Sequence, residues 1–203
     1  MKTIGVFIFN DAEELDFVGP YEAFTMINEV MQHLKQPDGV KVILISEDGK
    51  DITGKKGMRV GAHAAMSDIK KLDVMCILGG QGARAQIENK AVINWVKTIA
   101  PTCEWVTSVC TGSFILAKAG LTKGKRISTY WAAFEEFKKL GLEGELVPDL
   151  RYVRDGNVVT SAGVSAGIDM ALWLTGQMFD PTLARAVQRA MQYDPAPPYQ
   201  AEV

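Results

Sequence analysis

Cys110 is the residue whose type and position are best suited to nucleophilic chemistry. It follows the apolar run 105–109, which predicts a buried strand, and precedes a helical stretch at 111–119. A sulfur on such a turn lies near the unpaired N–H groups and the positive dipole at the start of the helix, which stabilise a thiolate. We therefore expect a nucleophilic Cys110 with a pKa below its usual value and a strained backbone.

The other cysteines are less well placed. Cys76 lies inside an apolar strand and is expected to be an inert core residue, whereas Cys103 is expected in a loop, partly exposed. An inert core position is also the alternative for Cys110, because free cysteines are among the most buried residues. Three cysteines without metal-type spacing indicate neither a disulfide framework nor a zinc site, and they fit a reducing cytoplasm.

A nucleophilic cysteine needs a proton carrier, and the two histidines are poorly placed to serve. His33 follows a helical stretch and His63 lies in a Gly- and Ala-rich region, so both are interpreted as surface or structural residues. Asp16, at the junction of the first strand and helix, would face Cys110 and would titrate high there. A helix cap is the alternative role for Asp16.

A glycine turn at residues 79–82 follows the apolar strand 72–78 and belongs to the same predicted site. We interpret it as part of an oxyanion hole in which the Gly80 and Thr111 amides point at one oxygen. A phosphate cradle is less well supported, because no Lys-Ser/Thr or dinucleotide spacing follows the glycines. An ordinary turn is the remaining alternative.

Strands and helices that alternate along the chain must bring these residues together. Apolar runs predict strands at 4–9, 40–46, 72–78 and 105–109, and helical spacing is found at 21–30 (opened by Gly19-Pro20), 90–100, 111–119, 131–140, 165–179 and 180–192. The fold class is therefore α/β, a doubly wound, mostly parallel, flavodoxin-like sheet sandwiched by helices. Hairpins are expected at 47–61, as a small excursion, and at 150–161. Ligands of such sheets bind outside the carboxyl ends of the strands, where Asp16, the glycine turn and Cys110 would converge.

Length and composition restrict the class of protein. The chain of 203 residues suits one α/β domain over 1–203, and its 47% apolar and 23% charged residues are typical of globular proteins. A net charge of −2 with interleaved signs offers no footprint for nucleic acid or an anionic membrane. No apolar run reaches the roughly 20 residues of a membrane span. We expect a small-molecule substrate and a cytoplasmic location.

Several motifs together resemble the ThiJ/PfpI superfamily, which is related to class I glutamine amidotransferases, and within it the isonitrile hydratases. These motifs are Leu15-Asp16-Phe17-Val18-Gly19-Pro20, Gly79-Gly80-Gln81-Gly82, Ser108-Val109-Cys110-Thr111-Gly112-Ser113, Gly163-Val164-Ser165-Ala166-Gly167 and the tail Tyr193-Asp194-Pro195-Ala196-Pro197-Pro198. The resemblance implies a homodimer, no metal and no organic cofactor. It also implies a nucleophilic Cys110 assisted by Asp16 and Thr111, with the Gly80 and Thr111 amides nearby.

The resemblance further implies a reaction. In isonitrile hydratases a thiolate attacks the carbon of R–N≡C, a nearby acid protonates that carbon, and the thioimidate adduct is hydrolysed to an N-formamide. Asp16 would carry the protons. An uncharged, linear substrate needs only a small apolar pocket, to which we assign Gly79, Tyr130 and Trp131.

The chain also departs from the family pattern. Thr129-Tyr130-Trp131 stands where many relatives carry Thr-His-Trp, so peptidase or amidase chemistry is not expected. Glu13-Glu14 before Leu15, and Leu78 in place of a proline, would reshape the rim of the pocket. The alternative function is a redox-responsive stress protein whose Cys110 is oxidised to a sulfinic acid. A ligand-binding regulatory module is a third interpretation, disfavoured because no basic helix-turn-helix segment is found.

Overall fold

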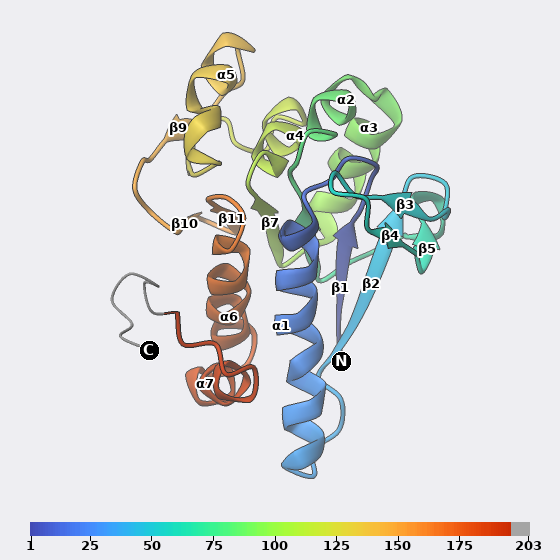
Figure 1. Cartoon of the computed structure of the whole chain (residues 1–203), viewed down its shortest axis with the longest axis vertical. Helices are drawn as coiled ribbons and strands as arrows, with labels where there is room; N and C mark the ends of the chain where they lie inside the picture. The colour runs from blue at the N-terminus through green and yellow to red at the C-terminus, as the bar shows by residue number, and fades with distance from the viewer. Residues whose placement is uncertain (196–203) are drawn as a thin grey trace.

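The computed structural model describes residues 1–195, which form a seven-stranded sheet with helices on both faces (Figure 1). The strands lie in the order β10-β11-β7-β6-β1-β2-β5, and neighbours are parallel except for β10 and β11. They are β1 (Lys2–Phe7), β2 (Val40–Ser46), β5 (Ala64–Ala65), β6 (Val74–Ile77), β7 (Trp105–Val109), β10 (Tyr152–Asp155) and β11 (Val158–Ser161). The predicted doubly wound, mostly parallel α/β fold is confirmed.

The central strands are buried along their length, as their apolar sequences predict. Every residue of β6 and β7 is buried, because helices cover both faces of a parallel sheet. β1 pairs with β2 on one side and with β6 on the other, so that Ile4 lies opposite both Val42 and Val74. The direction of winding reverses between β1 and β6, and the loops that follow these two strands open at one edge of the sheet.

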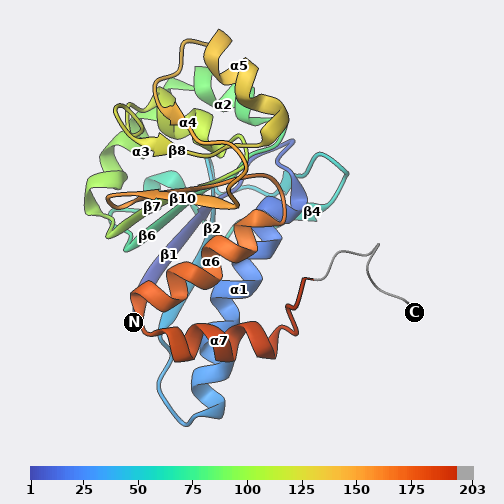
Figure 2. The same ribbon diagram turned by 90° about the vertical axis from the view of Figure 1, so that its left-hand side faces the viewer.

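Two groups of helices cover the sheet (Figure 2). On one face lie α1 (Glu14–His33), α6 (Ala166–Met178) and α7 (Pro181–Ala190), and on the other lie α2 (Ala83–Glu88), α3 (Lys90–Ile99) and α4 (Gly112–Lys118). α5 (Phe134–Lys139) lies outside α4, where Phe137 packs on Phe114 with ring centroids 5.5 Å apart. Within residues 1–195, no helix combines the length and the apolar character needed to cross a membrane.

Two short two-stranded sheets lie outside the main sheet. The hairpin predicted within 47–61 is present as β3 (Ile52–Thr53) and β4 (Arg59–Val60), and β8 (Arg126–Ile127) pairs with β9 (Glu145–Leu146). The hairpin predicted at 150–161 is formed by β10 and β11. Backbone hydrogen bonds tie the β3–β4 hairpin to the loop after β1: the Asp11 N–H donates to the Thr53 carbonyl and the Lys55 N–H to the Ala12 carbonyl, both at 2.9 Å.

Some boundaries differ from the prediction. α1 begins at Glu14, so Gly19 and Pro20 lie inside the helix and do not open it. Pro20 deprives only the Asp16 carbonyl of a helical N–H partner, and Pro20 is buried, so packing outweighs that loss.

Short elements account for the other differences. α2 was not predicted because its six residues are too few to show a helical period. The helix predicted at 131–140 is divided into a 3₁₀ turn, Trp131–Ala133, and α5. Further 3₁₀ turns lie at Met66–Asp68 and at Ala100–Thr102. Of the tail motif at 193–198, Tyr193, Asp194 and Pro195 lie within the described residues, and 196–198 lie outside them.

The turns that follow β6 and β7 are in close contact, so a side chain added between them is expected to lower stability. A Cβ at Gly112 would lie 2.3 Å from the Ile77 carbonyl oxygen and 2.7 Å from that of Leu78. Since backbone atoms of a buried strand cannot move aside, we expect Gly112→Ala to lower the free energy of unfolding by about 1–3 kcal/mol in urea denaturation. At Gly61, a Cβ would meet only the Asp51 carboxylate, at 3.5 Å. Gly61→Ala is therefore the control, expected to stay within about 0.5 kcal/mol. Equal losses in the two variants would contradict the close contact.

Candidate active site

Cys110 directly follows β7 and has a φ of +56°, in the left-handed region that residues other than glycine rarely adopt. Its N–H donates to the carbonyls of Ser161 and Ala162 at 3.2 and 3.3 Å. Its carbonyl accepts hydrogen bonds from Thr129 Oγ1 at 2.9 Å and Ser113 Oγ at 3.1 Å. These bonds hold the backbone of Cys110 from both sides, and the strained turn predicted from the sequence is confirmed.

Asp16 lies in the first turn of α1 and is fully buried. Its Oδ2 accepts a hydrogen bond from the Gly79 N–H at 3.1 Å, while Oδ1 has no hydrogen-bond partner within the described residues. The carboxyl also lies close enough to the Cys110 thiol for each group to shift the pKa of the other. The structure therefore brings Asp16, the glycine turn and Cys110 together at one edge of the sheet, as predicted.

Both acidic groups are harder to ionise here than in water. Desolvation by burial raises the pKa of Asp16 to about 7, although the hydrogen bond from Gly79 opposes the shift. The pKa of Cys110 rises to about 12, chiefly because of burial and then because of the negative charge of Asp16, against hydrogen bonds from Thr111. The lowered pKa expected for Cys110 is therefore wrong, because desolvation outweighs the start of α4. The high titration expected of Asp16 is confirmed.

Two acids this close titrate as a pair. Between a pH of about 7 and about 12 the pair holds one proton and one negative charge. Transfer of that proton converts a carboxylate beside a thiol into a carboxyl beside a thiolate, which is the nucleophilic form. The Thr111 N–H donates to the sulfur and favours its ionised form.

The glycine turn is fitted against Cys110 and Thr111. A Cβ at Gly79 would lie 2.5 Å from the Thr111 nitrogen and 2.8 Å from the Cys110 Cβ, so no side chain fits there. The Gly80 N–H donates to Thr111 Oγ1 at 3.1 Å, and the same hydroxyl lies 3.1 Å from the Gly80 carbonyl oxygen. The sequence predicted that the Gly80 and Thr111 amides point at one oxygen of the substrate. In this structure the Gly80 N–H already donates to Thr111 Oγ1, so it is not free to bind that oxygen.

A cavity of about 190 Å³ opens onto the sulfur. Its lining includes four of the predicted site residues, Gly80, Cys110, Thr111 and Tyr130. The assignment of Gly79 to the pocket is wrong, because Gly79 does not line the cavity and its N–H donates to the buried Asp16 carboxyl. The assignment of Trp131 to the pocket is wrong: its side chain is 76% exposed and does not line the cavity, because the 3₁₀ turn at Trp131–Ala133 directs it to solvent.

Five residues of the lining were not assigned to the site from the sequence: Glu13, Lys55, Gln81, Arg84 and Val164. The expected apolar pocket without a charged cluster is therefore wrong, since charged side chains form its rim. Arg84 Nη1 donates to the Gly80 carbonyl at 2.9 Å, and its Nε donates to Glu136 Oε1 at 2.9 Å. The Glu13-Glu14 departure from the family pattern was a local signal for a changed rim. Lys55 carries no such signal, because the fold of the β3–β4 hairpin brings it to the cavity.

The remaining cysteines and histidines lie away from this cavity. Cys76 is buried in β6, as predicted. Cys103 was expected to be partly exposed, but it is buried, and its Sγ donates to the Ile99 carbonyl at 3.4 Å. His63 Nδ1 accepts from the Leu44 N–H at 3.1 Å, a structural role, and neither it nor His33 lines the cavity. Within residues 1–195 no group of three or more His, Cys, Asp or Glu residues is arranged to hold a metal ion.

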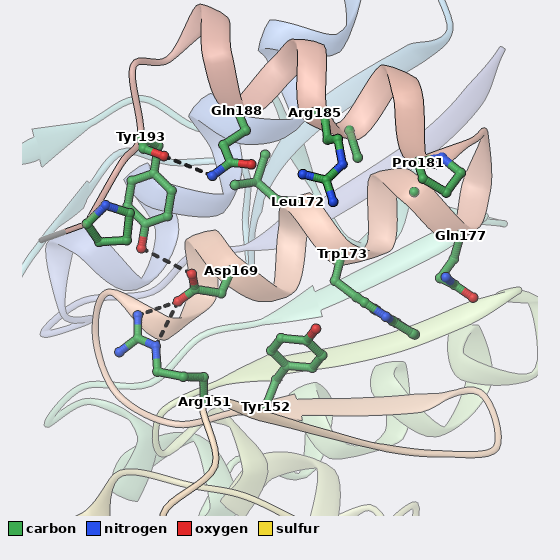
Figure 3. A pocket seen from close by; sticks show the side chains of 13 residues that line it. Arg151, Tyr152, Asp169, Leu172, Trp173, Gln177, Pro181, Arg185, Gln188 and Tyr193 are labelled. Atoms are coloured by element: carbon green, nitrogen blue, oxygen red, sulfur yellow. Dashed lines mark hydrogen bonds and ion pairs between the residues drawn. The ribbon is translucent and has the colours of Figure 1, made fainter.

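A larger hollow of about 490 Å³ is lined by residues of α6, α7 and β10 (Figure 3). Asp169 there accepts from Arg151 Nε at 2.8 Å and from the Tyr193 hydroxyl at 3.2 Å. This hollow shares no lining residue with the Cys110 cavity and is lined by no cysteine. We assign the active site to the smaller cavity because the nucleophile Cys110 lines it and the buried acid Asp16 lies against that nucleophile.

Comparison with known proteins shows extensive similarity. Residues 2–177 match the DJ-1/PfpI family. The isonitrile hydratase of Pseudomonas putida is 36% identical over 196 residues, which cover 97% of this chain and 80% of that protein. The crystal structure of a ThiJ/PfpI family protein from Pseudomonas syringae superposes with a TM-score of 0.86 at 27% identity, covering 100% of this chain and 79% of the other. DJ-1beta of Drosophila melanogaster shares the fold, with a TM-score of 0.81 at 20% identity over 96% of this chain and 99% of the other.

The raised pKa of Asp16 makes stability depend on pH. The folded protein binds the Asp16 proton more tightly than the unfolded chain, whose carboxyl has the ordinary pKa of 3.8, so this residue destabilises the fold increasingly as pH rises to about 7. Asparagine carries no charge and still offers an oxygen to the Gly79 N–H. We expect Asp16→Asn to stabilise the protein by under ~1 kcal/mol at pH 4 and on the order of 4 kcal/mol at pH 8.

Urea denaturation of both proteins at the two pH values measures this difference. The exposed Asp149→Asn is the control, and its effect is expected to stay within about 0.5 kcal/mol at both pH values. A gain for Asp16→Asn that does not grow between pH 4 and pH 8 would show that Asp16 is not a destabilised acid.

Proposed function

Because the chain belongs to the DJ-1/PfpI family, we propose that it is a cysteine-dependent enzyme that hydrates isonitriles to N-formamides. The observation that carries the proposal is the buried pair of Asp16 and Cys110, an acid and a sulfur nucleophile beside one small cavity. The 36% identity with the isonitrile hydratase of Pseudomonas putida supports the same reaction.

In the proposed first step the pair uses the single proton that it holds. Starting from the carboxyl and thiolate form, Asp16 donates its proton to the terminal carbon of R–N≡C. The Cys110 Sγ forms a bond to that carbon, which gives the thioimidate R–N=CH–S–Cys110. Asp16 is left as a carboxylate, and the adduct itself carries no charge.

In the second step Asp16 acts as the base. It accepts a proton from the water that adds to the thioimidate carbon and passes this proton to the nitrogen. The carbon–sulfur bond then breaks, the proton of the new hydroxyl returns to Asp16, and R–NH–CHO is released. Because the sulfur leaves as a thiolate that the Thr111 N–H can stabilise, the pair ends the cycle with one proton, as it began.

A second candidate function is a redox-responsive protein in which Cys110 is oxidised to a sulfinic acid. The thiolate attacks an oxygen of the peroxide, and burial together with the charge of Asp16 raises the pKa of Cys110 to about 12. Both reactions therefore start from the carboxyl and thiolate form of the pair, but only the hydration also uses the proton that Asp16 then holds. The hydratase proposal is better supported.

We place this chemistry in a reducing cytoplasm, because Cys110 must remain a thiol to act. All three cysteines are free in the structure. Recovery of the protein from the medium or periplasm of its native cells, with Cys110 in a disulfide, would contradict this location.

We also propose that the protein is a homodimer. Leu15 and Val18 lie three positions apart near the start of α1, and their large apolar side chains are 38% and 37% exposed. A second copy would cover them. Sedimentation equilibrium is expected to give twice the 22.2 kDa mass of the chain, and Leu15→Glu is expected to shift the equilibrium towards single chains. A single-chain mass for the wild type at micromolar concentration would contradict the proposal.

Turnover of a simple alkyl isonitrile, followed as N-formamide by chromatography, tests the proposed function. We expect turnover by the wild type, no detectable turnover by Cys110→Ala, and a kcat lowered about 10²- to 10⁴-fold in Asp16→Asn. Cys103→Ala is the matched control, since this cysteine is buried outside the cavity, and it should remain active. No turnover by the wild type, together with sulfinic acid at Cys110 after stoichiometric peroxide, would favour the redox function.

A further inference from the structure

The charged side chains around the Cys110 cavity differ in whether they have an ion-pair partner. Glu13, Lys55 and Arg84 line the cavity. The Glu13 carboxylate forms an ion pair with Lys56, and the Arg84 guanidinium forms one with Glu136. No ion pair involves Lys55 within residues 1–195. Lys55 is therefore the charge at the rim that remains available to a bound molecule.

Glu14 does not form an ion pair with Lys55 either. Its side chain is nearly buried and faces the backbone of the hairpin, where the Lys56 N–H donates to its Oε1. A Cβ at Gly54 would lie 2.6 Å from the same oxygen, which shows how closely the carboxylate is packed there. The ammonium group of Lys56 lies 3.6 Å from Glu14 Oε2. Glu13 and Glu14 thus share the Lys56 ammonium, and neither carboxylate forms an ion pair with Lys55.

The backbone holds Lys55 in place beside the cavity. Its N–H donates to the Ala12 carbonyl at 2.9 Å, and the Gly54 N–H donates to the Met58 carbonyl at 2.8 Å across the hairpin. Ala12 in turn forms a bridge with Gly80 of the glycine turn. Lys55 is therefore attached to the wall of the cavity through its main chain, and only its flexible side chain reaches solvent.

The inner end of the cavity has the opposite charge. At neutral pH the pair of Asp16 and Cys110 holds one negative charge, so an anionic group of a substrate would be repelled there. At the rim the same group would meet Lys55, with the side chains of Gln81 and Tyr130 as further hydrogen-bond donors in the lining. The cavity thus favours a molecule whose reacting end is neutral and whose other end is an anion.

We propose that the substrates of this site are short isonitriles that carry a carboxylate at the end opposite the reacting carbon, and that Lys55 is the specificity residue that binds this carboxylate. The proposal rests on the proposed function for the identity of the reacting group. The volume of about 190 Å³ limits the substrate to a small molecule, because cavities for drug-sized ligands measure roughly 300–1,000 Å³.

A pair of substrates that differ in charge and little in shape tests the proposal. Isocyanoacetate and its methyl ester are compared as the ratio of their kcat/KM values in the wild type, Lys55→Gln and Lys97→Gln. Lys97 is exposed on α3 and does not line the cavity, so Lys97→Gln removes the same charge elsewhere. We expect the ratio of acid to ester to fall about 3-fold in Lys55→Gln, as for one partly exposed ion pair, and to stay at the wild-type value in Lys97→Gln. An unchanged ratio in Lys55→Gln would overturn the proposal.

Alkylation of Cys110 gives a readout that does not depend on isonitrile turnover. Iodoacetate and iodoacetamide react with the same thiolate and differ in charge, and the rate at Cys110 is followed by mass spectrometry of its peptide. We expect the ratio of iodoacetate to iodoacetamide rates to fall about 3-fold in Lys55→Gln and not in Lys97→Gln. Added salt should lower this ratio in the wild type and have less effect in Lys55→Gln, because an exposed ion pair is screened.

The two readouts separate failure of this inference from failure of the proposed function. If isonitriles are hydrated and neither ratio changes in Lys55→Gln, the function stands and the role of Lys55 is wrong. If no isonitrile is hydrated but the alkylation ratio falls, the anion preference of the cavity stands and the assigned reaction is wrong.

Discussion

The turns that follow β6 and β7 lie against each other with no side chain between them, and the geometry of the site depends on that contact. The missing side chains of Gly79 and Gly112 let the backbone of one turn approach the backbone of the other within van der Waals distance. Thr111 then reaches Gly80 with its hydroxyl, and Cys110 is held in its left-handed conformation. A larger residue in either turn would move the sulfur away from the buried Asp16 carboxyl.

Asp16 shows how the fold keeps a proton available at neutral pH. A fully buried carboxyl with one hydrogen-bond donor, Gly79, is costly to ionise, and its pKa therefore lies near 7 instead of near 4. The same burial raises the pKa of Cys110, so neither group loses its proton to solvent easily. Burying Asp16 lowers the stability of the fold, and in the proposed mechanism the same burial keeps a proton available to the sulfur and the substrate.

Much of the fold could be predicted because buried parallel strands are apolar throughout, as in Trp105–Val109. The common edge for Asp16, Gly79 and Cys110 followed from the topology of such a sheet. The start of α1 could not be predicted, since burial of Pro20 decides it and a local Gly-Pro signal does not. The pKa of Cys110 depends on desolvation by segments distant in sequence, which the strand–turn–helix pattern does not contain. Lys55 reaches the cavity through tertiary contacts alone. Arg84 reaches it from α2, a helix too short to be predicted, and donates to the Gly80 carbonyl four residues earlier.

The β3–β4 hairpin contributes to the cavity without belonging to the main sheet. It is joined to the loop after β1 by main-chain hydrogen bonds of Asp11, Ala12, Thr53 and Lys55, which are independent of side-chain type. These main-chain hydrogen bonds do not depend on the Lys55 side chain. The pair of Asp16 and Cys110 is held by other elements of the fold. A substitution of Lys55 in this hairpin would therefore change the lining of the cavity while the main-chain attachment and the pair of Asp16 and Cys110 stay in place.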